Sequence, residues 1–168
     1  DGLDDFVYFG DRTGSERVNR VPVAGGAYVT LASGIAEPSG VAVASDHLLY
    51  AQYGPNVIGR MGLDGSSPTP VLSTSLSNPQ GLDVDIEAGK LYFVNRAMGR
   101  VERANLDGSS RETLATGLST PIDVSVDRLH GKVYWTEFIG GQIKRANLDG
   151  SSPQVLLSGL SQPHSLSV

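Results

Sequence analysis

The stretch VDRLHGKVYWTEFIGGQIKRANLDGSSPQVL, residues 126–156, alternates short runs of strand-forming residues with turn signals. Residues 132–136 (KVYWT) are rich in β-branched and aromatic side chains, which favour strands. The chain contains the dipeptides Gly140-Gly141 and Asp149-Gly150, and such dipeptides are typical of tight turns between antiparallel strands. The unit therefore predicts four short strands and no helix, at 122–126, 132–136, 142–146 and 153–157.

This unit recurs along the whole chain of 168 residues. The string LDGSS occurs three times, and tyrosines and proline-led segments return at intervals of 41 or 42 residues: Tyr8, Tyr50, Tyr92 and Tyr134, and Pro38, Pro79, Pro121 and Pro163. A period near 42 with four strands per unit is typical of a β-propeller, in which each sheet is a blade. We predict one all-β propeller domain over residues 1–168, with four strand-permuted repeats at approximately 1–43, 44–84, 85–126 and 127–168.

Composition excludes several classes of function. The net charge of −5 argues against a nucleic-acid partner, because phosphate binding requires a basic face. The chain has no cysteine, so thiolate metal sites are excluded, and its acidic segments do not match the spacing of a calcium loop. No apolar run is long enough to span a membrane. We expect no metal, no cofactor and no membrane span.

The last copy resembles a known repeat. Tyr134-Trp135-Thr136-Glu137, followed by IKRANLDGSS at 143–152, is similar to the YWTD repeat, the class B repeat of low-density-lipoprotein receptors. The third copy matches as well, with GKLYFVN at 89–95 and VERANLDGSS at 101–110, and the first copy reads Tyr8-Phe9-Gly10-Asp11. The second copy, aligned as Tyr50-Ala51-Gln52-Tyr53, departs most. The resemblance implies an extracellular or cell-surface protein.

Propellers of this family usually have six blades, whereas this chain has four repeats. The chain begins at a second strand near Phe6 and ends at a first strand that leads to Val168, so the two ends are complementary. Pairing them would cover two exposed strand edges. The sequence favours a homodimer with eight blades, closed by mixing N- and C-terminal strands. A four-bladed monomer and a part of a six-bladed ring are the alternatives.

A second group of repeated residues is expected to hold the blades together. One arginine per repeat lies two residues after an apolar strand position, which indicates packing between blades rather than a ligand site. We expect these arginines to pair with the polar residue at the fourth motif position, or with backbone carbonyls, and Tyr53 to interrupt that network. The predicted structural residues are Arg20, Arg60, Arg103 and Arg145, with Asp11, Asn95, Glu137 and the core side chain Trp135.

The loops differ between copies while the strands do not, and loop variation on a fixed scaffold is how such folds acquire ligands. We therefore predict a non-enzymatic scaffold that recognises a protein or peptide through rim loops. Its expected contact residues are Arg12, Tyr53, Asn56, Arg96, Met98, Glu137, Phe138 and His164. No catalytic residues are predicted, because no nucleophile motif is present. The alternatives are a lyase or hydrolase with a site near the propeller axis, where His164 lies, and a self-assembling structural unit without a ligand.

Overall fold

The computed structural model describes residues 5–12, 14 and 16–168, and these residues form four antiparallel sheets without a helix. Blade 1 contains β1 (Phe6–Asp11), β2 (Arg17–Pro22) and β3 (Val29–Ser33). Blade 2 contains β4 (Pro38–Ala44), β5 (His47–Gln52), β6 (Val57–Gly62) and β7 (Thr69–Leu72). Blade 3 contains β8 (Pro79–Asp85), β9 (Lys90–Asn95), β10 (Arg100–Asn105) and β11 (Glu112–Ala115). Blade 4 contains β12 (Pro121–Asp127), β13 (Lys132–Glu137), β14 (Gln142–Asn147) and β15 (Gln154–Leu157).

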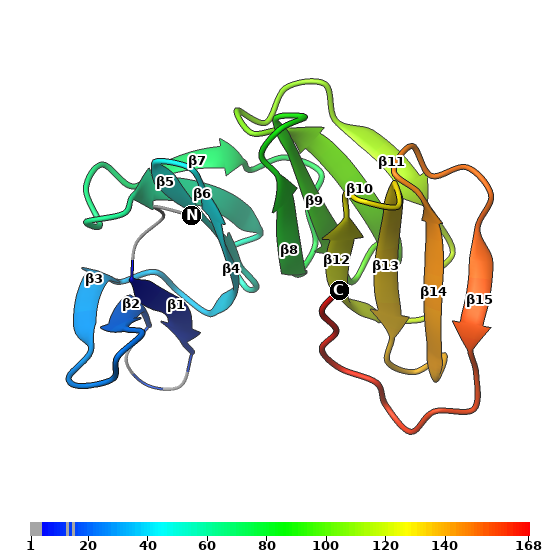
Figure 1. The fold of residues 1–168 in the computed structure, drawn as a ribbon, viewed down its shortest axis with the longest axis horizontal. Coiled ribbons are helices and arrows are strands. Elements are labelled where there is room, and N and C mark those ends of the chain that lie inside the picture. The colour runs from blue at the N-terminus through cyan, green and yellow to red at the C-terminus, as the bar shows by residue number, and fades with distance from the viewer. Residues whose placement is uncertain (1–4, 13, 15) are drawn as a thin grey trace.

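The four blades fan out in an arc, so the chain is a β-propeller, as predicted (Figure 1). Strands pair with their sequence neighbours in each sheet, and β4, β8 and β12 lie on the inner side of the arc. The four strands expected for the last repeat are confirmed within one residue at each end. Tight turns at the repeated Asp-Gly dipeptides join the third and fourth strands of blades 2, 3 and 4.

The core is divided into three apolar clusters, and each cluster lies between two successive blades. Val18 of blade 1 packs with residues of blade 2 that include Tyr50 and Met61. Blades 2 and 3 share the second cluster, and blades 3 and 4 share the third, in which Trp135 is 1% exposed. A single twisted sheet could not bury its two faces, so each blade depends on its neighbours for its stability.

Polar contacts repeat at the same interfaces. The Arg103 Nη1 atom of blade 3 donates to the carbonyl of Leu148 in blade 4, at 2.8 Å. Arg20 of blade 1 donates in the same way to the Leu63 carbonyl of blade 2, at 3.1 Å. Both acceptors are the leucine of an LDGSS turn. The arginine therefore joins one blade to the next through a backbone carbonyl, the second of the two kinds of partner predicted.

Glycine is required where these turns meet the preceding blade. Gly108 has φ +86°, and a Cβ atom there would overlap the carbonyl oxygen of Val71 in blade 2. The equivalent glycines of blades 2 and 4, Gly65 and Gly150, face the outer strand of the preceding blade in the same way. The repeated Asp-Gly dipeptide thus serves both the turn and the close approach of two blades.

The structure corrects the alignment of the second repeat. Arg60 lies opposite Leu49, whereas Arg103 lies opposite Tyr92. The second motif is therefore Leu49-Tyr50-Ala51-Gln52, one residue earlier than predicted from the tyrosine spacing. Gln52 occupies the fourth position and donates to the Ala36 carbonyl at 3.4 Å. The prediction that Tyr53 interrupts the network is wrong, because Tyr53 lies one residue beyond it.

The two ends of the arc stay apart within one chain. The C-terminal segment 163–168 runs back beside β12, where Leu166 N donates to the Asp123 carboxylate at 3.1 Å (Figure 1). Among the described residues, no strand pairing joins this segment to β1. The four blades therefore do not close by themselves into a ring, and closure with other blades stays a prediction.

We expect the substitution Gly108→Ala to lower the free energy of unfolding by about 3 kcal/mol, because it combines left-handed strain with overlap of a neighbouring backbone. The matched control is Gly89→Ala, where φ is +63° but an added Cβ atom would meet no heavy atom of the other described residues within 4 Å. The control should cost only about 1 kcal/mol. Urea unfolding of both variants measures the difference, and equal losses would contradict a structural role for the contact with Val71.

Candidate functional site

One residue directly follows each of the equivalent strands β1, β5, β9 and β13, and the four together form a row along one edge of the arc. We call this set the rim row: Arg12, Tyr53, Arg96 and Phe138. The backbone of three of these residues is fixed by the same hydrogen bond. In each case the N–H group donates to the carbonyl of the residue just before the proline that begins the inner strand. The pairs are Tyr53 to Glu37, Arg96 to Asn78 and Phe138 to Thr120. The backbone of these positions repeats from blade to blade while the side chain changes.

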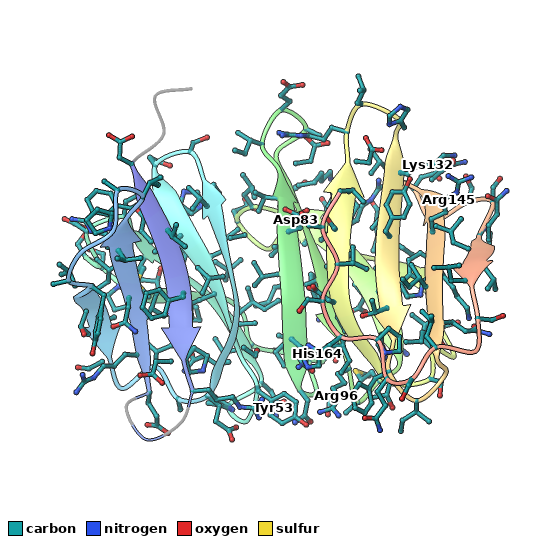
Figure 2. All side chains as sticks on the ribbon, turned by 60° about the horizontal axis from the view of Figure 1, so that its bottom comes forward. Tyr53, Asp83, Arg96, Lys132, Arg145 and His164 are labelled. Carbon is teal, nitrogen blue, oxygen red and sulfur yellow. The ribbon has the colours of Figure 1, made fainter. Side chains whose placement is uncertain are left out.

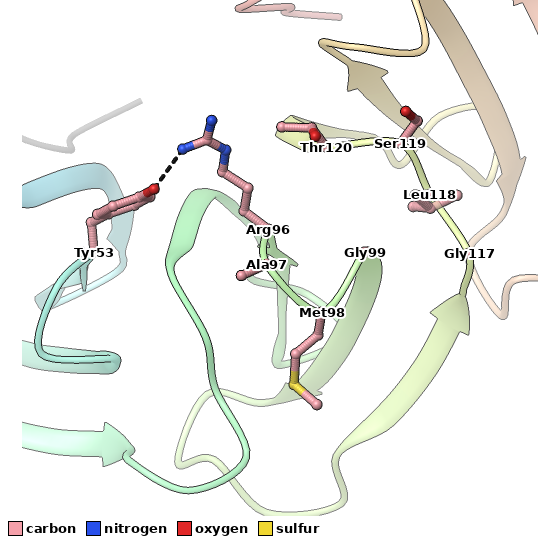
Figure 3. A pocket seen from close by; sticks show the side chains of 9 residues that line it. All are labelled: Tyr53, Arg96, Ala97, Met98, Gly99, Gly117, Leu118, Ser119 and Thr120. Atoms are coloured by element: carbon pink, nitrogen blue, oxygen red, sulfur yellow. Dashed lines mark hydrogen bonds between the residues drawn. The ribbon is translucent and has the colours of Figure 1, made fainter.

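Three side chains of the rim row contact one another across blades. The Arg12 guanidinium lies 4.5 Å from the centre of the Tyr53 ring, and the Arg96 guanidinium lies 5.5 Å from it. Arg96 Nη1 also donates to the Tyr53 hydroxyl at 2.6 Å (Figure 3). A cation near an aromatic face is attracted to its π-system, so Tyr53 holds two arginines in place. Glu37 lies 3.9 Å from Arg12 and balances its charge in part.

Phe138 continues the row toward the C-terminal segment. Its ring meets His164 edge to face, with 6.3 Å between centroids and an interplanar angle of 87°. Tyr53, Arg96 and His164 lie along one edge of the molecule, the lower edge in Figure 2. Five of the eight residues predicted for ligand contact thus form two contacting groups, one of Arg12, Tyr53 and Arg96 and one of Phe138 and His164.

A cavity of about 510 Å³ opens beside this row. One wall is formed by Tyr53, Arg96 and the loop from Ala97 to Gly99, and the other by residues 117–120 (Figure 3). Met98 lines it and is 38% exposed. The cavity therefore combines a cationic side with an apolar side on the predicted rim.

Two further residues that were predicted to contact a ligand instead form hydrogen bonds within the chain. Glu137 is 3% exposed, accepts a hydrogen bond from Ser119 N at 2.8 Å and pairs with Lys144 at 2.6 Å. Its side chain is buried beneath the rim, which corrects its assignment to the ligand surface. Asn56 accepts a hydrogen bond from Asn78 N at 2.6 Å and thereby fixes the loop between blades.

The predicted structural residues lie at or near the blade interfaces. Asn95 is fully buried; it accepts from Ser77 N at 2.8 Å and donates to the Ser75 carbonyl at 3.1 Å. Neither Asn95 nor Glu137 pairs with the repeated arginines, which corrects the first of the two predicted kinds of partner.

The other predicted structural residues differ from blade to blade. Arg145 donates to Gln154 in its own blade, Arg60 is exposed, and Asp11 is the last residue of β1.

A second, smaller cavity of about 180 Å³ lies among the inner strands, between Gln80, Asp123 and His164. Burial raises the pKa of Asp123, although two backbone N–H groups donate to its carboxylate. Gln80 Oε1 is buried and has no hydrogen-bond partner among the described residues. Sequence reasoning missed Gln80 and Asp123, although each stands one or two residues after a repeated proline, where an inner strand begins.

In the described part of the chain, no three histidine, aspartate or glutamate side chains gather closely enough to hold a metal ion. The same residues contain no helix that could cross a membrane.

No protein-family model matches the chain. The chain is 33% identical over 57 residues to the vitellogenin receptor Yl of Drosophila melanogaster. That match covers 34% of this chain and 3% of the receptor, so the chain corresponds to a small part of it.

Solved structures show the same fold. A chain in the crystal structure of a nidogen/laminin complex aligns with 99% of this chain at a TM-score of 0.92 and 23% identity, and 65% of that chain is covered. A streptogramin B lyase aligns with 96% of this chain at a TM-score of 0.77 and 16% identity, and 55% of the lyase is covered. The virginiamycin B lyase of Staphylococcus aureus aligns with 95% of this chain at 0.74 and 20% identity, again with 55% covered.

The shared architecture shows that the chain has the β-propeller fold, and its repeated motif and the receptor match make it similar to the YWTD repeat, the class B repeat of low-density-lipoprotein receptors.

Proposed function

We propose that the chain is a non-enzymatic scaffold that recognises a protein or peptide through the rim row and the cavity beside it. One observation carries the proposal: four positions with the same place in their blades carry Arg12, Tyr53, Arg96 and Phe138, of which the first three contact one another and the fourth contacts His164. Aromatic and arginine side chains are the residue types that contribute most to protein interfaces. The likeness to a receptor and to a chain of a two-protein complex supports a protein partner and an extracellular or cell-surface location.

Selection of linear peptides from a random display library on the immobilised chain tests this function. We expect enriched peptides whose affinity falls roughly 30-fold for Phe138→Ala, since truncation of a central aromatic anchor costs about 2 kcal/mol. The control Leu129→Ala alters an apolar side chain that is 87% exposed in a turn outside the rim row. Both variants should keep the melting transition of the parent chain. Peptides that bind the Phe138 variant as tightly as the parent would exclude the rim.

The second candidate is an enzyme that uses the inner cavity, since His164 and Asp123 both line it. In that case a screen with hydrolase and lyase substrates should detect turnover that His164→Ala abolishes. Turnover that survives this change, or no turnover in any screen, would remove the candidate.

The exposed faces at the two ends of the arc favour self-association as a further property. Leu157 in β15 is 53% exposed, whereas Leu72, its equivalent in blade 2, is 8% exposed because blade 3 covers it. At the other end, Gly25 donates to the Pro22 carbonyl at 2.8 Å as Gly108 does to Asn105, yet a Cβ atom added at Gly25 would meet no other described residue within 4 Å. Each end thus carries one half of the interface that recurs inside the chain, and we propose a second copy as the occupant.

Light scattering across a dilution series measures this association. Two copies joined at both ends should give a mass near 35 kDa, twice the 17.7 kDa of one chain, and form one eight-bladed ring. Leu157→Asp should restore the single-chain mass because it places a charge in the interface, whereas Leu129→Asp should leave the dimer intact. A single-chain mass at every concentration would overturn the dimer and favour a ring completed by blades from outside this chain.

A further inference from the structure

We infer that the cavity beside Arg96 binds a carboxylate of a partner segment that also carries a neighbouring apolar side chain. The inference rests on the proposed function and specifies the chemistry of its ligand. It begins from the charge of Arg96, which lies half-buried at the cavity wall. Among the described residues, the Arg96 side chain makes one hydrogen bond, to the Tyr53 hydroxyl, and pairs with no carboxylate.

Two other half-buried arginines of the chain show the pairing that a guanidinium makes with a carboxylate. Arg103 pairs with Glu112 at 2.7 Å, and Arg111 pairs with the buried Glu102. A half-buried guanidinium that lacks an anion keeps donors available, and carboxylate is the group whose geometry matches them. Arg96 is therefore prepared for an acidic group that the chain itself does not supply.

The Tyr53 hydroxyl adds a second donor to the same place. Its oxygen accepts the Arg96 Nη1–H bond, so its own proton remains free for an acceptor. Arg12 packs over the same ring and makes only a 3.9 Å contact with Glu37, where both side chains are more than 40% exposed. Although the whole chain carries a net charge of −5, this part of the rim is locally cationic.

The carboxylate of Glu137, which supports one wall of the cavity, does not oppose this inference. Glu137 supports the opposite wall through Ser119 N, but it is buried and its charge is compensated by Lys144 at 2.6 Å. The hydroxyl groups of Ser119 and Thr120, which line that wall, make no hydrogen bond with other described residues. They are available to bind a polar ligand.

The remaining surface of the cavity is apolar. Met98 lines it from the same loop as Arg96 and Leu118 lines it from the facing wall, and methionine adapts readily to side chains of different shape (Figure 3). A ligand with a carboxylate alone would leave this side unused, and an apolar ligand alone would leave Arg96 and the Tyr53 proton unpaired. An aspartate or glutamate next to an apolar residue in an extended protein segment satisfies both.

The peptides selected on the immobilised chain test the inference through a double-mutant cycle. We expect enriched peptides to contain an acidic residue beside an apolar one. Replacing that acid by its amide should weaken binding about tenfold, as should Arg96→Gln, since a hydrogen bond to a charged group contributes about 1.5 kcal/mol or more. Combining both changes should weaken binding little further. Arg128→Gln, which removes an exposed charge from a turn outside the rim row, serves as control and should have no effect.

The outcomes separate this inference from the function on which it rests. Peptides that require Phe138 but are neutral or basic would preserve rim recognition and overturn the carboxylate site. Acidic peptides that bind the Arg96 variant as tightly as the parent would also overturn it. If no peptide depends on any rim residue, both proposals fall. Affinity for the acidic peptides should decrease as salt is raised, whereas affinity for their amide versions should change little.

Discussion

Contact between successive blades is the constraint on which the rest of this structure depends. No blade encloses a core of its own, because the three apolar clusters all lie between blades. The same interfaces carry a repeated polar connection, from an arginine of one blade to the turn of the next, as in Arg103 to the Leu148 carbonyl. Glycine in that turn lets the backbone approach the preceding blade. Stability is therefore shared along the arc as in other repeat proteins.

This constraint explains why the rim can vary. The strands β9 and β13 end at Asn95 and Glu137, and each of these polar residues bonds the loop before the inner strand of its own blade. The following residue leaves the sheet at the same place in every blade, and its side chain takes no part in the interblade clusters. Arginine, tyrosine and phenylalanine are therefore all compatible with the fold at this position. Recognition properties can change there at little cost in stability.

The electrostatics of the rim differ from those of the whole molecule. The chain is acidic, and the carboxylates of the LDGSS turns are stabilised locally: a hydrogen bond from Ser109 lowers the pKa of Asp107, and Ser151 does the same for Asp149. The cationic pair at Tyr53 lies instead at the ends of the second strands. An approaching acidic segment would meet a localised positive site on a negative background, which favours orientation over general attraction.

Strands, turns and the repeat follow from the amino-acid sequence because they depend on neighbouring residues: β-branched runs, Asp-Gly dipeptides and recurring prolines each act locally. The fold class follows from the interval of about 42 residues at which these elements recur. The register of the second repeat did not, because Tyr50 keeps the 42-residue spacing although the residue opposite Arg60 is Leu49. The sequence left two kinds of partner open for each repeated arginine, a carboxylate and a backbone carbonyl. Strand pairing within one blade does not place the residues of the next blade, so it could not decide between them. Arg12, Tyr53 and Arg96 lie about 40 residues apart in the sequence, and only the packing of successive blades brings them together. The same packing buries Glu137 and leaves Arg96 without an anion.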